Sequence, residues 1–405
     1  MKNKNIKKVV LAYSGGLDTS AIIPWIKENY NAEVIAFVAN MGQSKEELKN
    51  IEKKAIVSGA SECFIKDLRK EFIKYYLYPL LQSYAIYENN YFLGTAIARP
   101  IIAKKQVELA IKINADALCH GSTGKGNDQI RFESAYTSLA PNLKIISPWR
   151  EWKFTSRIDL LKYLKKNKIK TNYSKDKIYS KDENIFHTST EGGLLENVWN
   201  SSEKKNIWSL TKDSLDAVEK PKYLKVKMLN GYVESINNKK ISLLKSLKKF
   251  NKLGSLHGIG RVDFVENRLI GIKSRGCYET PGGTIISKII QSLDQLILDR
   301  DCLRWKNVIG SEFSYLVYDG KWFTPFRKVL QKNIKFFSKL ISGTVFIRLY
   351  KGNVTVLKKK SKNSLYSKEF STFNNSNFSY KHNYADGFIK LFTMSSLIRS
   401  IKKLN

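Results

Sequence analysis

Apolar runs and amphipathic stretches alternate along the first 170 residues. Short apolar runs predict strands over residues 9–13, 33–40, 62–66, 117–120 and 144–147. Apolar residues at helical spacing predict helices over residues 19–29, 44–58, 68–87, 100–114 and 155–166, the third kinked at Pro79. Ser44 and Glu47 form a capping-box pattern, and Gly59 is expected to end that helix. Such alternation favours an α/β fold, a parallel sheet with helices on both faces.

The pattern changes near residue 170, where a long polar loop is expected. Hairpins follow over residues 223–236, 261–273 and 344–357, with turns at Asn230-Gly231, Glu266-Asn267 and Lys351-Gly352. Helices are predicted around 283–303 and 324–340, an irregular segment over 358–383, and an amphipathic stretch over 385–401. We therefore expect three parts: residues 1–170, an α+β part over 171–362, and a C-terminal helical arm over 363–405. The apolar residues of the arm could pack on another subunit or on the chain's own domain.

Composition narrows the class of protein. Hydrophobic residues make up 42% of the 405 residues, and no apolar run approaches the ~18 residues of a membrane span. The basic and then apolar N-terminus is too short for a signal peptide and has no cleavage-type site, so we expect a cytoplasmic protein. Cys63, Cys119, Cys277 and Cys302 form no CxxC pair, and the histidines show no HExxH spacing, so no metal site is expected.

The net charge of +34 has two interpretations. A basic surface is typical of nucleic-acid binding. Mutational bias toward A/T-rich codons would also raise the lysine content, and it explains the abundant Asn, Ile and Tyr as well. Because the lysines are scattered from end to end, we favour bias and expect only nonspecific contacts with nucleic acid.

A small-residue loop follows the first predicted strand directly. Residues 12–20 read AYSGGLDTS. Gly15 and Gly16 let the backbone turn tightly, so that the N–H groups at the following helix N-terminus face one point and favour an anion there. Ser14, Thr19 and Ser20 supply hydroxyl groups, and Asp18 could hold a metal ion or a polar ligand group. The loop predicts a phosphate site, although it lacks the Walker A pattern; an ordinary glycine-rich turn is the alternative.

A second glycine-rich segment follows the fourth predicted strand. Gly121, Gly124 and Gly126 allow close approach of the chain to a ligand, and the polar residues between and after them are Thr123, Asn127, Asp128 and Arg131. These side chains supply a hydroxyl, an amide, a carboxylate and a guanidinium within nine residues. Such a set is suited to amino-acid head groups, since Arg can bind a carboxylate through two parallel hydrogen bonds. The alternative is a solvated loop before a helix that begins at Asp128. Both glycine-rich loops follow strands and should therefore meet at the carboxyl edge of the sheet.

These loops resemble those of a known family. SGGLDTS is similar to the pyrophosphate loop of the ATP pyrophosphatase superfamily. The segments AYSGGLDTS, VANMGQ, GTAIARP, HGSTGKGNDQIRFE, YSKDENIFHTSTEGG, GIGRVDFVENRLIGIKSRGCYETPGG and LYSKEF resemble the argininosuccinate synthases and occur in family order. The resemblance implies a parallel-sheet nucleotide-binding domain of the HUP or PP-loop type over 1–170, a synthetase domain that binds citrulline and aspartate over 171–362, and an oligomerisation arm over 363–405.

The resemblance also implies a reaction. A carbon–nitrogen ligase of arginine biosynthesis would join L-citrulline and L-aspartate through a citrulline-adenylate, releasing AMP and pyrophosphate. ATP with Mg²⁺ would be a co-substrate, with no tightly bound cofactor and no covalent enzyme nucleophile. The expected assembly is a cytoplasmic homotetramer.

Site residues follow from the motif positions that this chain shares with the family. The resemblance places ATP on Ala12, Tyr13, Ser14, Gly15, Gly16, Leu17, Asp18, Thr19, Ser20, Ala39 and Gly121. It places aspartate on Thr123, Asn127 and Asp128. It places citrulline on Tyr91, Asn127, Arg131, Ser180, Ser189, Glu266 and Tyr278. Asp18, Asp128 and Arg131 are the expected catalytic residues.

One position departs from the family pattern. Many members carry Ser where this chain has Ala96, so one hydroxyl contact to citrulline is expected to be missing, at a cost of about 0.5–1.5 kcal/mol. Two other functions stay open. A tRNA-modifying adenylase of the same superfamily would fit the charge, but Cys119 and Cys277 lie in different segments. A non-catalytic binding protein would fit the compositional drift, but the loops are intact.

Overall fold

The computed structural model of the chain describes residues 6–124, 126–169, 179–203, 206–371 and 383–404. The polar loop predicted after residue 170 lies, over residues 170–178, outside the described residues. The chain forms two units, Met1–Asn363 and Ser364–Asn405. The first unit contains a parallel sheet and two antiparallel sheets.

The parallel sheet contains the five strands that the apolar runs predicted. They are β1 (Lys8–Ala12), β2 (Glu33–Asn40), β3 (Glu62–Asp67), β4 (Ala117–Cys119) and β5 (Lys144–Ile146). Their order is β3-β2-β1-β4-β5, and every neighbouring pair is parallel. The strand order reverses between β1 and β4, and such a switch point opens a crevice at the carboxyl ends of the strands. The predicted α/β fold class is confirmed.

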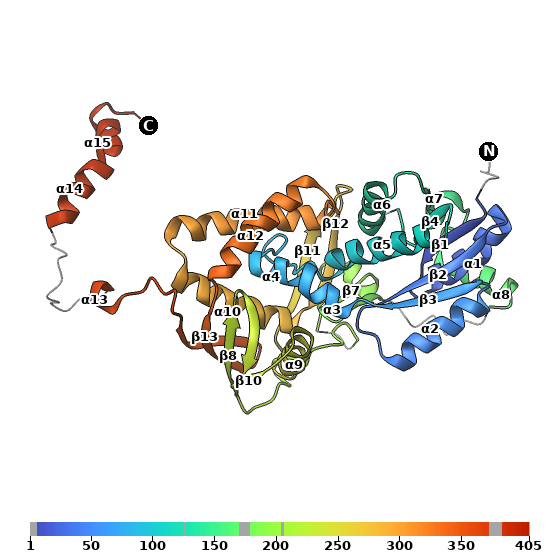
Figure 1. Ribbon diagram of the computed structural model, residues 1–405, viewed down its shortest axis with the longest axis horizontal. Coiled ribbons are helices and arrows are strands. Elements are labelled where there is room, and N and C mark those ends of the chain that lie inside the picture. The colour runs from blue at the N-terminus through green and yellow to red at the C-terminus, as the bar shows by residue number, and fades with distance from the viewer. Residues whose placement is uncertain (1–5, 125, 170–178, 204–205, 372–382, 405) are drawn as a thin grey trace. The chain divides into compact units, whose positions relative to one another are not determined.

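Helices cover both faces of this sheet (Figure 1). Val9 and Leu11 of β1 face one core and Val10 faces the other, because successive side chains of a strand point to opposite faces. One face is covered by α1 (Leu17–Tyr30), α2 (Lys45–Val57) and α8 (Arg157–Lys166), the other by α5 (Gly94–Lys112) and α6 (Asp128–Leu139). A short helix, α7 (Pro148–Glu151), precedes α8. Ser44 caps α2 by accepting a hydrogen bond from the N–H of Glu47, at 3.1 Å, which is the Ser44 half of the predicted capping box.

The predicted helix over residues 68–87 is divided. It consists of α3 (Arg69–Phe72), a π-helical turn (Ile73–Leu77) and α4 (Tyr78–Ser83). Pro79 lies in the first turn of α4, so the irregularity precedes it. The prediction that the helix reaches residue 87 is wrong, because Tyr84 adopts a left-handed conformation that ends it.

The helix predicted from Pro100 begins at Gly94 instead. Pro100 lies inside α5, where it cannot donate the usual backbone hydrogen bond. The preceding turn stays helical because Ala96, Ile97 and Ala98 are fully buried in the core. This extra turn contains Thr95 and Arg99, which line the cavity described below.

The first antiparallel sheet has the order β10-β9-β8-β13-β14. Its strands are β8 (Lys222–Leu229), β9 (Tyr232–Ile236), β10 (Lys239–Lys240), β13 (Gly343–Tyr350) and β14 (Asn353–Lys360). The turns predicted at Asn230-Gly231 and Lys351-Gly352 are confirmed, and all four residues have positive φ angles. That conformation is typical of two-residue hairpin turns.

The second antiparallel sheet has the order β11-β12-β7-β6. Its strands are β6 (Ser180–Glu183), β7 (Thr188–Glu191), β11 (Arg261–Asn267) and β12 (Lys273–Glu279). The turn predicted at Glu266-Asn267 is wrong, because Asn267 is still paired, opposite Lys273. The turn comprises residues 268–272, where Gly271 has a φ of 81°. Glu266 is therefore a strand residue.

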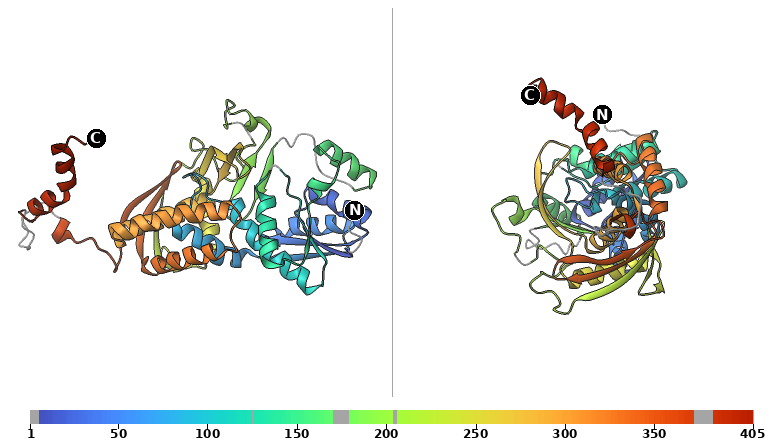
Figure 2. Two further views of the ribbon diagram at one scale, coloured as in Figure 1. Left: turned by 90° about the horizontal axis from the view of Figure 1, so that it is seen from above. Right: turned by 90° about the vertical axis from the view of Figure 1, so that its left-hand side faces the viewer.

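Four long helices complete the first unit beside these sheets (Figure 2). They are α9 (Leu243–Leu256), α10 (Pro281–Ile297), α11 (Arg300–Tyr318) and α12 (Pro325–Leu340). The single helix predicted over 283–303 is wrong, since Asp299 caps a new helix by accepting a hydrogen bond from the N–H of Cys302 at 2.8 Å. The core of this part also includes residues between Leu68 and Ile101, so the segment from α3 to the start of α5 packs with the antiparallel sheets.

The second unit contains short amphipathic helices. The irregular segment predicted over 358–383 includes the end of β14 and α13 (Lys368–Ser371), while residues 372–382 lie outside the described residues. The amphipathic stretch forms α14 (Asn383–Phe392) and α15 (Met394–Ile401). Across the described residues of both units, no helix is long and apolar enough to cross a membrane.

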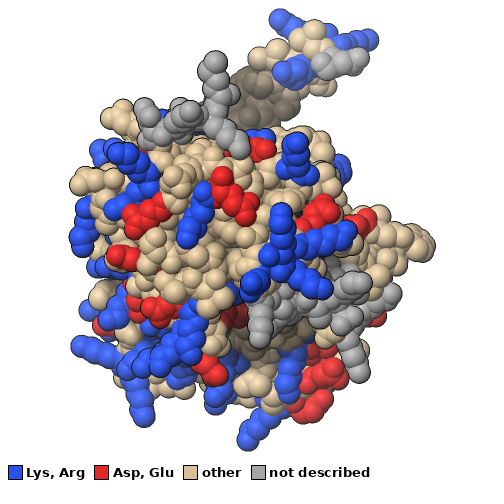
Figure 3. Space-filling model, turned by 90° about the vertical axis from the view of Figure 1, so that its right-hand side faces the viewer, with Lys and Arg blue, Asp and Glu red and all other residues tan. Residues whose placement is uncertain are grey.

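Charged side chains are spread over the surface that Figure 3 displays, with Asp and Glu between the Lys and Arg residues. This face has no single basic patch that stands apart from acidic neighbours. The spread matches the scattered lysines of the sequence.

Candidate active site

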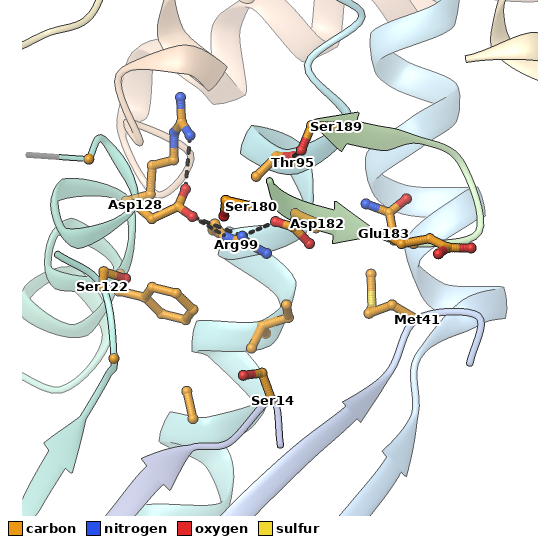
Figure 4. Close-up of a pocket in the computed structure, with 18 of the residues that line it drawn as sticks. Ser14, Met41, Thr95, Arg99, Ser122, Asp128, Ser180, Asp182, Glu183 and Ser189 are labelled. Carbon is orange, nitrogen blue, oxygen red and sulfur yellow. Dashed lines mark hydrogen bonds and ion pairs between the residues drawn. The ribbon is translucent and has the colours of Figure 1, made fainter. Parts of the chain in front are cut away.

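A cavity of about 470 Å³ lies at the carboxyl ends of the parallel strands. The ends of β1 and β2, the β4–α6 loop and the first turns of α5 form one side of it, and β6, β7, β11 and β12 form the other. Figure 4 shows Ser14 at the end of β1 and Ser189 on β7, with Arg99 between them. The cavity therefore joins the parallel sheet to the second antiparallel sheet.

The first glycine-rich loop lies between β1 and α1. Gly15 has a φ of 74°, a conformation that favours glycine. Gly16 is the N-cap of α1, and among the described residues no side chain caps this helix end. Lys54 supports the loop by donating to the carbonyl of Gly15 at 2.6 Å. The first N–H groups of α1 therefore have no side-chain acceptor there, as an anion site requires.

The predicted ATP residues are only partly in the cavity wall. Ala12, Tyr13, Ser14, Asp18, Thr19, Ala39 and Gly121 line it. Leu17 belongs to the hydrophobic core, and the buried hydroxyl of Ser20 donates to the carbonyl of Gly16 at 2.8 Å. Gly15 and Gly16 shape the loop behind the wall. Leu17 and Ser20 thus support the loop, and their side chains do not reach the cavity.

The second glycine-rich loop touches the first. A Cβ atom on Gly121 would lie 2.9 Å from Cγ2 of Thr19. Buried His120 holds the loop, since its Nδ1 accepts a hydrogen bond from the N–H of Ser122 at 3.2 Å while its Nε2 pairs with Glu133 at 2.9 Å. Ser14, Asp18 and Thr19 of the first loop and Gly121, Thr123 and Gly126 of the second therefore line one cavity, at the carboxyl ends of the strands as predicted.

Replacing Gly121 with Ala should separate the two loops. The added methyl group would press on Thr19, so we expect KM for ATP to rise by roughly 10-fold, about 1.4 kcal/mol, with little loss of stability. Gly124→Ala is the matched control, because a Cβ at Gly124 meets no described atom within 4 Å. Steady-state kinetics with varied ATP would measure both, and equal KM values in the two variants would contradict the close approach.

A chain of four charged residues crosses the cavity (Figure 4). Nη1 of Arg131 lies 2.9 Å from Asp128, Asp128 lies 2.8 Å from Nη2 of Arg99, and Arg99 also pairs with Asp182. Burial opposes ionisation of Asp128, but the two guanidinium groups outweigh it and lower the pKa of Asp128 to about 2. Asp128 is therefore a carboxylate at any physiological pH.

Arg131 has one donor to spare. Its Nε donates to the carbonyl of Tyr318 at 2.9 Å, and its guanidinium lies 4.9 Å above the Tyr318 ring. Only 5% of the residue is exposed, and its Nη2 has no hydrogen-bond partner among the described residues. Because Arg131 lines the cavity, this unpaired donor is suited to a ligand carboxylate.

Five of the seven predicted citrulline residues lie apart from Asn127 and Arg131, which belong to the second glycine-rich loop and α6. Tyr91, Ser180, Ser189, Glu266 and Tyr278 all line the cavity. The rings of Tyr91 and Tyr278 stack with centroids 4.5 Å apart. The hydroxyl of Tyr91 accepts hydrogen bonds from the N–H groups of Thr95, at 3.1 Å, and Ala96, at 3.3 Å. Ala96 itself is fully buried and absent from the cavity wall, so it packs in the core as the helix turn requires.

Thr123 and Asn127, predicted to bind aspartate, also line the cavity. The side-chain oxygen of Asn127 accepts a hydrogen bond from the N–H of Leu269 at 3.2 Å. Leu269 belongs to the turn between β11 and β12, so Asn127 fixes the second loop against the second antiparallel sheet. With Asp128 next to it, the three predicted aspartate residues lie together.

Sequence reasoning missed six charged residues of the wall, among them Lys181 and Glu183. Arg99, Asp182, Glu191 and Arg268 line the cavity and pair with one another or with predicted residues. All four lie inside the motifs that carried the resemblance, and Arg99 could have been found as a charged residue within the small apolar segment GTAIARP. Its partner Asp182 lies 83 residues away, which no local pattern reveals.

Among the described residues, no three His, Cys, Asp or Glu side chains form a metal-binding group.

Comparison with known proteins agrees with this geometry. The family model described as arginosuccinate synthase N-terminal HUP domain matches residues 8–170, and the one described as arginosuccinate synthase C-terminal domain matches residues 179–399. The chain is 60% identical over 403 residues to the argininosuccinate synthase of Buchnera aphidicola subsp. Baizongia pistaciae, covering 100% of this chain and 98% of that protein. It is 61% identical to that of Buchnera aphidicola subsp. Cinara cedri, over 98% and 99% of the two chains, and 55% identical to that of Erwinia tasmaniensis, over 100% of each. These matches confirm the predicted family and its ligase activity: the chain belongs to the argininosuccinate synthase family.

Proposed function

We propose that the cavity is the site at which this chain ligates L-citrulline to L-aspartate. The reaction consumes ATP, releases AMP and pyrophosphate, and forms argininosuccinate in arginine biosynthesis. The ureido oxygen of citrulline attacks the α-phosphate of ATP, which expels pyrophosphate and leaves citrulline-adenylate. The aspartate amine then attacks the ureido carbon and expels AMP. Catalysis is mostly a matter of positioning and charge stabilisation, because the adenylate itself supplies the leaving group.

ATP would lie along the two glycine-rich loops. The uncapped N-terminus of α1 would face the phosphates, with hydroxyl groups of Ser14 and Thr19 beside it. The cavity wall holds six acidic and four basic side chains, so it does not by itself neutralise a triphosphate. This excess of negative charge supports Mg²⁺ as a co-substrate bound to ATP, with Asp18 as the carboxylate nearest the first loop.

Citrulline and aspartate would lie against the polar side of the cavity. The spare Nη2 of Arg131 is suited to the carboxylate of citrulline, and Glu266 to its ammonium group. Asp128 stays ionised, and a carboxylate has more lone pairs than its two Arg partners occupy, so it can also hold the aspartate amine. Thr123 and Asn127 would orient the rest of aspartate.

One observation carries this proposal: described residues of the two glycine-rich loops line the same cavity as Tyr91, Ser189 and Glu266. The pure protein with ATP, Mg²⁺, citrulline and aspartate should release AMP and pyrophosphate in equal amounts, and omitting either amino acid should stop AMP formation. Citrulline labelled with ¹⁸O in its ureido group should transfer the label to AMP. Absence of both products would contradict the proposal, and pyrophosphate release that needs tRNA but not citrulline would favour a tRNA-modifying adenylase.

We also propose that the arm joins copies of the chain into a cytoplasmic homotetramer. In α14 and α15 the side chains of Phe388, Leu391, Leu397 and Ile401 are each more than half exposed, which is costly unless another surface covers them. The four cysteines are free thiols, in keeping with a reducing compartment. Light scattering should give the mass of four chains, and removal of residues 383–405 should lower it.

A further inference from the structure

Three charged side chains form a separate cluster at the citrulline wall. Arg268, in the turn after β11, lies 2.5 Å from Glu191 of β7 through its Nη2. Its Nε lies 3.6 Å from Glu266 of β11. All three residues line the cavity, and their side chains are 34% (Glu191), 15% (Arg268) and 5% (Glu266) exposed. Two carboxylates thus share one guanidinium.

This charge balance is unfavourable in the empty site. Two carboxylates and one guanidinium leave one negative charge, and Glu266 is almost completely removed from solvent. Arg131 also faces Glu266 but is already paired with Asp128 at 2.9 Å. An unbalanced buried charge is costly, so such a site either keeps a proton or binds a cation.

We propose that Glu191 and Arg268 are positioning residues that hold Glu266 as the site of the citrulline α-ammonium group, and that this site gives up a bound proton when the ammonium enters. The inference rests on the proposed function, since it takes citrulline as the ligand. The ammonium keeps its three hydrogens, and the proton passes from the carboxyl group to solvent. Arg131 would hold the α-carboxylate at the same time, so the zwitterion meets a group of opposite charge at each end.

The surroundings of Glu266 support a bound proton. Burial, and then the charge of Glu191, raise the pKa of Glu266 to about 7, against the opposing effect of Arg131 and Arg268. The titratable and charged groups that face it from the elements around it are Tyr87, Tyr91, Arg131, Glu191, Arg268, Tyr278 and Tyr318. The site is therefore protonated below about pH 7. Citrulline must then displace the proton, so its KM should rise roughly 10-fold for each pH unit below that point.

Glu191→Gln tests the positioning role. One carboxylate is lost, so at pH 8 we expect KM for citrulline to rise roughly 10-fold while kcat stays within a factor of about three. The same change removes a charge that raises the pKa of Glu266, so the pH at which KM begins to rise should shift downward. A purely structural role would not move this pH profile. Preference for citrulline over 5-ureidopentanoate, which lacks the ammonium group, should also fall.

Asp263→Asn is the matched control, because Asp263 pairs with Arg275 at 2.7 Å between β11 and β12 but does not line the cavity. It should leave KM for citrulline and its pH profile unchanged. If Glu191→Gln still forms AMP but its pH profile of KM for citrulline is unchanged, this inference is wrong while the proposed function stands. Absence of AMP formation by the unmodified protein would instead count against the proposed function.

Calorimetry on the unmodified protein measures the released proton directly and does not require that a variant fold. Citrulline is titrated at pH 6.5, with an unreactive ATP analogue present, in phosphate and in imidazole buffers, whose ionisation enthalpies differ. We expect release of roughly three quarters of a proton per citrulline, as a group with a pKa of about 7 implies. Equal binding enthalpies in the two buffers would overturn the proton exchange.

Discussion

Arg131→Lys should lower kcat/KM for citrulline by about 100-fold to 1000-fold, or about 3–4 kcal/mol. The guanidinium uses its planar fork in three directions: Nε to the Tyr318 carbonyl, Nη1 to Asp128, and Nη2, which has no hydrogen-bond partner among the described residues. An ammonium group on a flexible stem keeps the charge but cannot serve all three directions at once. The variant should retain its fold because Asp128 still has Arg99 as a partner.

Steady-state AMP formation with varied citrulline would measure this loss. KM for ATP should change little, since the first glycine-rich loop is separate from Arg131. Arg150→Lys is the matched control, because Arg150 pairs with Glu133 outside the cavity and its side chain is 50% exposed. If Arg131→Lys keeps kcat/KM within about threefold of the unmodified enzyme, Arg131 does not bind a substrate carboxylate.

Glu279→Ala should lower the melting temperature by about 3–4 °C or more, which corresponds to a loss of about 3 kcal/mol or more in a chain of this length. Buried Glu279, at the end of β12, accepts hydrogen bonds from the N–H groups of Ser209, Leu210 and Thr211 at 2.7–2.9 Å. The hydroxyl of Thr211 donates to the same carboxylate at 2.7 Å. Alanine would leave four donors without their acceptor, and a buried donor without an acceptor is costly.

Thermal and urea unfolding of both proteins would measure the effect. Glu219→Ala is the control, because Glu219 pairs with Lys351 at the surface with 77% of its side chain exposed, where a salt bridge contributes at most about 1 kcal/mol. Glu279 precedes the start of α10 and follows Tyr278, so KM for citrulline should also rise in the variant. A melting temperature equal to that of Glu219→Ala would show that residues 209–211 do not depend on this carboxylate.

Local rules account for the parts of the fold that were predicted well. The strand–loop–helix over β1 and α1, the Ser44 cap and the turns at Asn230-Gly231 and Lys351-Gly352 depend on residues within a few positions of one another. Predicted helix ends and turn positions were wrong where they depend on more than the local sequence. Tyr84 ends α4 early, the turn after β11 lies beyond Asn267, and α5 begins before Pro100 because buried neighbours hold its first turn.

The amino-acid sequence by itself determined the family, the parallel sheet and the two glycine-rich loops, because these depend on short patterns that each carry their own backbone geometry. Only the tertiary structure decided which side chains share the cavity. Arg99 meets Asp182 across 83 residues and Arg268 meets Glu191 across 77, whereas Ser20, two residues from Asp18, is buried behind the loop. Such pairings join segments that are far apart in the sequence, and the free energy of burying a charge depends on all the groups around it and on no single segment.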